Sequence, residues 1–202
     1  SNNVVQGNTI GMNLDQTVTV GNGAQGVWIG SGATDNTIGG TAAAAANIIT
    51  GAPYAGIEVN GAGTTGNALL GNLVFGNSEL GIDLIGIGGV TANDLGDADT
   101  GPNNLQNFPV LATARTNAIN QLILTGTLNG TASSYYRIEF FANTSQTSSG
   151  YGEGQTYLGF ANVATDGSGN ATTSTTLTVN IPVGSFITAT ATRATDGSYT
   201  SF

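Results

Sequence analysis

A short glycine-led pattern that returns at regular intervals is the feature of this sequence that most limits its fold. A glycine followed by an apolar residue, a variable residue and a second apolar residue occurs at Gly26, Gly56 and Gly81. Periods of roughly 20 to 50 residues are typical of stacked architectures, in which each repeat buries its apolar side against its neighbours. The repeat search therefore takes precedence over any local helix or strand prediction.

Two further patterns share the period. Asn36 and Asn67 begin one of them, and Asn47 and Asn72 begin the other. Each period thus holds three short apolar segments, which are too short for helical repeats. We predict a short right-handed parallel β-helix, with apolar side chains directed inward and the asparagines bonded to their copies in the next rung.

The second half of the chain has a different period. Apolar and polar residues alternate there over longer segments, which predicts a sandwich of about seven strands. The clearest strands are expected at 121–128, 135–142, 156–164, 171–179 and 186–193. The fold class is therefore all-β, with a β-helix and its acidic terminal loop over residues 1–107 and a β-sandwich over residues 108–202.

The composition excludes several functions. The chain of 202 residues has three Lys or Arg, 12 Asp or Glu, and neither His nor Cys. It therefore lacks an imidazole base, a thiol nucleophile and a Cys/His zinc site. A net charge of -9 argues against nucleic acid as a partner, and the apolar runs are too short for membrane insertion. An acidic chain without lysine, rich in Asn, Gly, Thr and Ser, suits an extracellular or cell-surface location.

Several segments resemble a known group of proteins. Residues 7–11, 36–40 and 81–84 resemble the right-handed β-helix repeats of very large bacterial surface and secreted proteins of adhesin type, and residues 89–94 and 96–109 are similar to the segment that ends the helix in those proteins. In those proteins this segment leads into an immunoglobulin-like domain. The resemblance covers essentially the whole chain, and it implies an adhesive or architectural role without an assigned reaction.

An acidic loop is the candidate metal site. Asp94, Asp97 and Asp99 lie within six residues, close to Asn93 and Asn103. Calcium takes six to eight oxygen ligands from flexible loops, and alternate acidic residues can face one point. The spacing does not match an EF-hand loop. The sequence leaves open a calcium site or a solvated linker between the domains.

A row of side chains is the candidate ligand site. Trp28, Glu58 and Asp83 occupy the same middle position in successive repeats, so they are expected to point outward and to stack at about 4.8 Å. Two carboxylates beside an exposed tryptophan could bind glycans, or act as the pair of a retaining glycosidase. The alternative is that polar residues simply occupy outward positions of a solenoid.

The favoured function is structural. Residues 1–114 contain no Lys, Arg or His, so the base that β-helix lyases use is missing, and we expect no enzyme activity. The repeat pattern is already present at Asn3 without a capping segment, which indicates either neighbouring parts of a larger surface protein or head-to-tail self-association into a noncovalent filament. The alternatives are a carbohydrate-binding module and a glycoside hydrolase on a β-helix.

Overall fold

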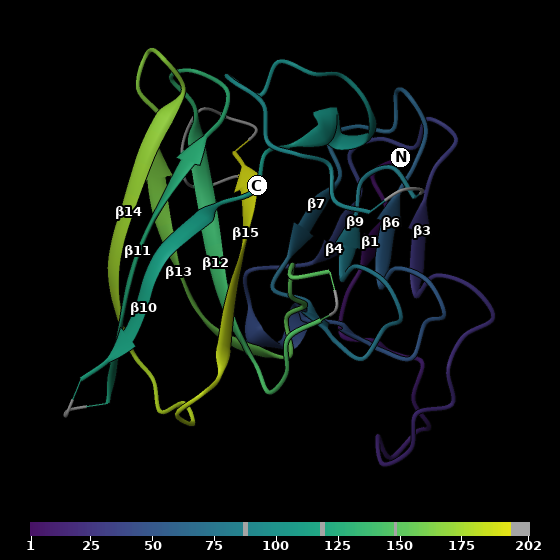
Figure 1. Cartoon of the computed structure of the whole chain (residues 1–202). Helices are drawn as coiled ribbons and strands as arrows, with labels where there is room; N and C mark the ends of the chain where they lie inside the picture. Colours follow the sequence, from purple (N-terminus) through teal and green to yellow (C-terminus); the bar gives the residue numbers. More distant parts are fainter. Residues whose placement is uncertain (87–88, 118–119, 148, 195–202) are drawn as a thin grey trace. The chain divides into compact units, whose positions relative to one another are not determined.

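The computed structural model describes residues 1–86, 89–117, 120–147 and 149–194, and this part of the chain is all-β (Figure 1). Two 3-10 segments interrupt the strands, η1 (Ala43–Ala45) and η2 (Pro102–Leu105). Three of the five alanines at 42–46 thus form a single 3-10 turn inside a loop, as expected for a run too short to form a stable helix. No helix of the described residues is long and apolar enough to cross a membrane.

The repeats form three parallel sheets, each with three strands. The chain visits the three sheets in turn and then returns to the first, so successive visits make three rungs. The rungs are β1 (Val4–Val5), β2 (Thr9–Ile10) and β3 (Val27–Ile29), then β4 (Thr37–Gly39), β5 (Ile48–Ile49) and β6 (Ile57–Val59), then β7 (Ala68–Leu70), β8 (Leu73–Val74) and β9 (Ile82–Asp83). This arrangement is compatible with a β-helix.

The register between rungs is the one that the repeats predict. Val27 pairs with Ile57, and Ile57 with Ile82. Inward side chains of the strands form one apolar cluster, whose buried members are Ile29, Ile38, Ile49, Ile57, Val59 and Val74. Two- and three-residue strands are sufficient because each one is paired with its copy in the next rung and buries one or two branched side chains.

Asparagine ladders connect the rungs, as the sequence predicts. The side-chain Nδ2 of Asn36 donates to Oδ1 of Asn67 at 2.7 Å, and Nδ2 of Asn47 donates to Oδ1 of Asn72 at 2.9 Å. The same Oδ1 atoms also accept the backbone N–H of the preceding asparagine. All four asparagines are buried, so the ladder satisfies polar groups that would otherwise be costly in the core.

The second half forms two antiparallel sheets. One contains β10 (Val110–Thr116), β11 (Gln121–Asn129) and β14 (Asn170–Thr178), and the other contains β13 (Thr156–Ala164), β12 (Tyr135–Asn143) and β15 (Phe186–Arg193). Leu122 and Leu124 of the first sheet and Ile138 and Phe140 of the second belong to one buried cluster. The five strands expected from the sequence are confirmed to within one residue at each end. Six strands lie in the described part of this half.

The chain divides into two compact units that interleave along the sequence. The parallel unit contains residues 1–91, 100–105 and 146–155, and the antiparallel unit contains residues 92–99, 106–145 and 156–202. The sequence predicts a single boundary after residue 107. The difference arises because the two short segments 100–105 and 146–155 hydrogen-bond to strands of the parallel unit, although they lie far from these strands in sequence.

The second face of β12 is also buried. Alternation predicts one apolar face with Ile138 and Phe140 and one more polar face with Arg137 and Glu139. Both charged side chains are nevertheless buried, and Arg137 Nε donates to Glu139 Oε1 at 2.8 Å. The guanidinium also donates to the Tyr157 hydroxyl at 3.0 Å. The two charges on the polar face of β12 are thus paired with each other and hydrogen-bonded. A buried ion pair needs both interactions to offset the cost of removing its charges from water.

Candidate functional site

The acidic loop brings three carboxylates together. Asp94, Asp97 and Asp99 each offer an oxygen within 4.8 Å of the others, so the loop could hold a cation. Asp97 lies in the left-handed region, with φ at 55°, and Gly96 before it also has a positive φ. This local backbone conformation folds residues 94–99 back on themselves. The expected grouping of the three aspartates is therefore present.

Asn107, which the sequence analysis does not single out, holds this loop in place. Its Oδ1 accepts the N–H of Asp94 at 3.0 Å, and its Nδ2 donates to the backbone oxygen of Asp94 at 2.7 Å. Its own N–H donates to Asp97 Oδ1 at 2.7 Å, and the Thr131 hydroxyl reaches Asp97 Oδ2 at 3.4 Å. One asparagine among many carries no sequence signal for such a role.

The carboxylates differ in how well they are satisfied. Asp94 accepts the N–H of Ala98, whereas Oδ1 of Asp99 is buried and has no hydrogen-bond partner among the described residues. Burial raises the pKa of Asp97, and the Asp94 carboxylate raises it further. Burial also raises the pKa of Asp99, with added contributions from Asp94 and Asp97. A bound cation would supply the positive charge that compensates these neighbouring carboxylates.

The two asparagines expected beside the aspartates have other partners. Asn93 forms a pair of hydrogen bonds with the backbone of Phe108, at 2.8 and 2.9 Å. Asn103 lies in the parallel unit, where its Oδ1 accepts the N–H of Asn67 at 3.0 Å and its Nδ2 donates to the Asn67 oxygen at 2.7 Å. Asn103 thus extends an asparagine ladder. The structure does not place either carboxamide with the three aspartates.

The row of Trp28, Glu58 and Asp83 has the expected register but not the expected exposure. Trp28 pairs with Glu58, and Glu58 pairs with Asp83. Trp28 is 52% exposed, whereas Glu58 is 4% and Asp83 5% exposed. The expectation that both carboxylates face solvent is therefore wrong, because residues of neighbouring loops bond to both of them.

The hydrogen bonds of these two carboxylates explain their burial. Asp83 Oδ1 accepts the backbone N–H groups of Ile85 and Gly86, at 2.9 and 3.0 Å. Gly86 lies directly against the Glu58 carboxylate, where a larger residue would collide with it. Glu58 accepts bonds from Gln25, Trp28 and Asn60. Both acids are thus held as structural acceptors.

The two ends of the coil of rungs differ. At the end formed by β7 and β8, called the covered end, Asn103 bonds to Asn67, and Val74 forms a two-way backbone pair with Gly154, at 2.9 and 2.7 Å. The Glu153 carboxylate accepts the N–H groups of Gly76 and Asn77. Residues distant in sequence therefore bond to β8 and to Asn67, which directly precedes β7.

At the other end, β1, β2 and β3 pair with β4, β5 and β6, and among the described residues no segment distant in sequence bonds to their outer backbone groups. We call these three strands the open end (Figure 1). The connection between β2 and β3 covers residues 11–26, and it is more than twice as long as the equivalent connections of the later rungs, at 50–56 and 75–81. The additional length forms a hairpin around a Met12–Thr19 bridge. Insertions in repeat proteins often carry contact surfaces.

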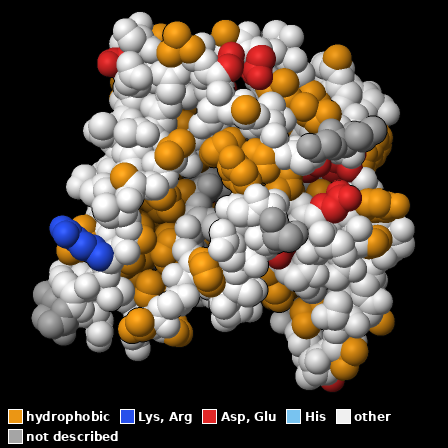
Figure 2. Space-filling view, viewed as in Figure 1, with side chains coloured by type: hydrophobic (Ala, Val, Ile, Leu, Met, Phe, Trp, Pro, Cys, Tyr) orange, Lys and Arg blue, Asp and Glu red, His pale blue; other side chains and the backbone are white. Residues whose placement is uncertain are grey.

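The hairpin presents apolar side chains on a fixed backbone. Leu14 at its tip is fully exposed, and Val18 and Val20 are more than half exposed. Asn13 Oδ1 accepts the N–H groups of Thr17 and Val18, both at 2.9 Å. The turn therefore does not need Leu14 for its own stability. Asp15 directly follows Leu14 at this tip, and Figure 2 shows apolar side chains with acidic ones among them on one face of the molecule.

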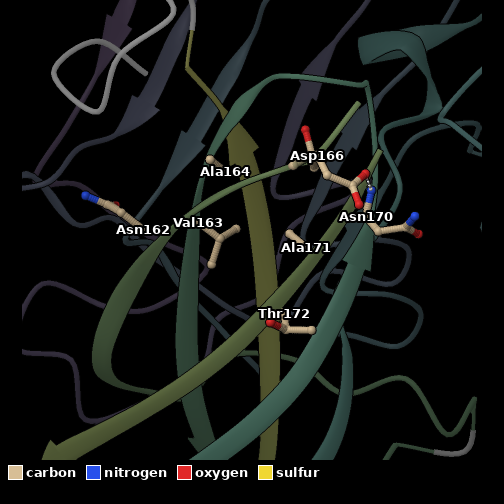
Figure 3. Close-up of a pocket in the computed structure, with 8 residues that line it drawn as sticks. Asn162, Val163, Ala164, Asp166, Asn170, Ala171 and Thr172 are labelled. Atoms are coloured by element: carbon tan, nitrogen blue, oxygen red, sulfur yellow. Dashed lines mark hydrogen bonds between the residues drawn. The ribbon is translucent and has the colours of Figure 1, made fainter. Parts of the chain in front are cut away.

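A depression between β13 and β14 is a weaker candidate for a functional site than the acidic loop. It is open to solvent, and residues 162–166 and 170–172 line it (Figure 3). Its carboxylate, Asp166, accepts the N–H groups of Ser168 and Asn170, at 2.8 and 2.9 Å. These bonds lower the pKa of Asp166. The carboxylate is therefore used to shape the turn that it belongs to.

Comparison with known proteins does not assign this chain to a family. No protein-family model matches the sequence, and no curated protein matches it significantly. The functional argument therefore rests on the residues and contacts described above.

Proposed function

We propose that this chain is a structural and adhesive component of a cell surface or extracellular matrix. In this proposal the parallel unit is a short right-handed β-helix and the antiparallel unit is an immunoglobulin-like β-sandwich. Support comes from the three rungs in register and from two antiparallel sheets that share one apolar cluster. Rigid stacked rungs suit a role in which the molecule is a spacer or a building block.

The observation that carries the proposal is the difference between the two ends of the coil. The open end presents three strand edges beside a hairpin with the exposed Leu14. Strand edges are templates for pairing with another chain unless they are blocked. A contact that joins the open end of one copy to a different surface of the next is heterologous, and such contacts propagate into filaments.

Such a filament would be noncovalent. The chain contains no cysteine for an intermolecular disulfide and no lysine for an isopeptide bond. Cohesion would come from backbone pairing and apolar contacts. An acidic chain without lysine that is rich in hydroxyl and amide side chains suits an extracellular location, and the three grouped aspartates make calcium, which is abundant outside cells, the expected ion.

The glycoside hydrolase alternative has little support. A retaining enzyme needs one carboxylate free to attack and another free to donate a proton. Glu58 and Asp83 are buried, and each accepts hydrogen bonds from neighbouring loops. Neither is available to a polysaccharide chain in this arrangement, and we propose no reaction for the protein.

The experiment that tests the proposal blocks the open edge without disturbing the fold. Both the N–H and the oxygen of Asn3 are used toward the second rung, where Asn3 N donates to Asn36 and Asn3 O accepts from Thr37. Because backbone groups alternate in direction along a strand, the N–H of Val4 points to the open side. Val4→Pro removes this donor.

Sedimentation velocity and negative-stain electron microscopy of the purified chain provide the readout. We expect concentration-dependent association of the unchanged protein, and a loss of at least tenfold in association for Val4→Pro at an unchanged unfolding midpoint. Val183→Ser, a change at a fully exposed residue of the antiparallel unit, is the control and should leave association unchanged. Monomers at all concentrations, with and without calcium, would contradict the assembly proposal.

A further inference from the structure

Trp28 is an unusual surface residue in this protein. It is the sole tryptophan of the chain, and it lies in the middle of β3 with about half of its surface exposed. Its strand neighbours Val27 and Ile29 pack against the apolar cluster of the parallel unit. A large aromatic side chain on the outer side of a strand needs a reason, because burying it would contribute more to stability than exposing it.

The indole is fixed from beneath by a buried acid. Its Nε1–H donates to Glu58 Oε1 at 3.2 Å, and Glu58 is 4% exposed. Asn60 Nδ2 donates to the same oxygen at 2.8 Å, and Gln25 Nε2 donates to Oε2. Glu58 therefore anchors three side chains in one arrangement, and the tryptophan cannot rotate without leaving a buried carboxylate short of a donor.

Gly30 fixes the indole from the side. A methyl group at position 30 would overlap Cζ2 and Cη2 of the Trp28 ring. The six-membered ring therefore lies against the backbone at Gly30, and the exposed half of the indole faces solvent. Gly30 itself is buried. The hydrogen bond and the glycine together hold the ring along the surface of the sheet.

Two carboxamides share the Glu58 carboxylate with the indole N–H. The amide groups of Gln25 and Asn60 donate to Glu58, which fixes their planes. Neither carboxamide oxygen accepts a hydrogen bond among the residues that the structure describes. Both side chains are partly exposed. A fixed apolar ring beside amide acceptors is a surface that can contact the C–H face of a sugar and accept bonds from its hydroxyl groups.

We infer that Trp28, Gln25 and Asn60 form a binding site for neutral pyranose sugars of a polysaccharide. The net charge of -9 disfavours anionic glycans. Glu58 is fully engaged, so it leaves no free carboxylate for a cationic ligand. Because the ring is already fixed, binding costs little side-chain entropy. Asp83, the third member of the row, takes no part because it is committed to the turn at residues 85–86.

The single tryptophan allows a direct test. Its emission reports on this site alone, without a background from other tryptophans. We expect a saturable blue shift when cellohexaose, maltohexaose, chitohexaose or mannohexaose is added to the full chain, with one of the four bound at a Kd of about 1 mM or lower, as suits a small exposed site. The absence of a saturable change with all four sugars would overturn the inference.

Variants separate this site from other binding surfaces. Retardation in gels that contain the corresponding polysaccharide gives a readout that does not need the tryptophan. Trp28→Ala should reduce the affinity at least tenfold, and Gly30→Val should do the same while keeping the indole. Tyr54→Ala, at another exposed aromatic residue of the parallel unit, should leave binding unchanged.

The outcomes are distinguishable from those of the assembly experiment. Retardation that survives Trp28→Ala would place the sugar elsewhere and overturn the inference. Because Trp28 is exposed, its truncation should leave the fold intact, which far-ultraviolet circular dichroism checks. Sedimentation of the same variants reports on self-association, so loss of sugar binding with unchanged association leaves the assembly proposal in place.

Discussion

The two ends of the parallel coil differ in what lies against the backbone groups of their terminal strands. A stack of strands must present unpaired backbone groups wherever it stops. At the covered end, Asn103 supplies a partner to Asn67, which directly precedes β7, and Gly154 supplies one to Val74 of β8, while Glu153 accepts two further N–H groups. At the open end, β1, β2 and β3 have no such partners among the described residues.

From this difference we expect that the position of a residue in the ladder, and not its type, sets its contribution to stability. Asn47 and Asn8 are consecutive members of one ladder. Asn47 is fully buried and makes side-chain bonds in both directions. Asn8 is exposed, and its side chain bonds to Asn47 of the second rung and to the backbone oxygen of Gln6 in its own rung. An asparagine that bonds to the rungs on both sides is buried like a core residue, although asparagine is typical of turns.

The largest predicted effect concerns Asn47. Asn47→Ala removes bonds to Val5, Asn8 and Asn72 and leaves buried groups without partners. We expect a loss of about 3 kcal/mol or more in the free energy of unfolding, measured by urea denaturation. Asn8→Ala should cost about 1 kcal/mol or less. Equal losses for the two variants would contradict the distinction between the ends.

The second prediction concerns Glu153 at the covered end. Glu153→Ala removes the acceptor for Gly76 N at 2.7 Å, and for Asn77 N and Nδ2 at 3.1 and 2.9 Å. We expect a loss of about 1–3 kcal/mol, with faster hydrogen exchange at the Val74 amide. Glu79→Ala is the matched control, because Glu79 is an exposed acid close in sequence to Gly76 and Asn77. Unchanged exchange at Val74 would show that residues 150–155 do not depend on Glu153 for their position.

The third prediction contrasts Glu153 with Asp99, whose Oδ1 lacks a donor among the described residues. Burial raises the pKa of Asp97 and Asp99 above the ordinary value near 4, so the folded chain binds more protons than the unfolded chain. Stability should therefore fall as the pH rises through this window. Calcium at ten times its Kd should restore about 1.4 kcal/mol at pH 7.

Thermal unfolding with calcium and with magnesium provides the measurement. Asp99→Asn should remove most of the calcium effect and reduce the pH dependence, because it removes one of the three carboxylates. Asp166→Asn, at a carboxylate outside this loop, should keep the calcium effect. If calcium leaves the Tm of the unchanged protein where it is, the acidic loop is a linker and holds no ion.

The smallest predicted effect on stability concerns the hairpin of the open end. Leu14→Ser should change the free energy of unfolding by less than about 0.5 kcal/mol, since the side chain is fully exposed. Self-association of this variant should nevertheless weaken severalfold in sedimentation velocity, because an exposed leucine is a suitable contact residue. Association that is unaffected by Leu14→Ser but lost with Val4→Pro would restrict the contact to the strand edges.

The periodic features of the fold were predictable from the sequence. The spacing of Gly26, Gly56 and Gly81 predicts the register of β3, β6 and β9, and Asn36 and Asn67 predict the ladder. Alternation predicts the long strands of the antiparallel unit. These features depend on residues that recur at fixed intervals, so one sequence contains several copies of the same signal.

The site residues were predictable only in part. The grouping of Asp94, Asp97 and Asp99 follows from their closeness in sequence, whereas the role of Asn107 depends on the way the chain folds back over them. Register predicts the row that contains Glu58, but its burial depends on Gly86 and Gln25, which lie in loops without a period.

The sequence by itself determined the period, the inward residues and the ladder positions, because local spacing decides which side chains share a face. Only the tertiary structure decided which end is covered. Glu153 reaches Asn77 across 76 residues, and Asn103 reaches Asn67 across 36. The contact between Glu153 and Asn77 has no copy elsewhere in the described chain, whereas Asn103 repeats the Asn36–Asn67 bond from a segment outside the strand pattern of the repeats. A pairing between distant, unrepeated residues depends on the packed backbone that brings them together, and spacing along the chain carries no record of it.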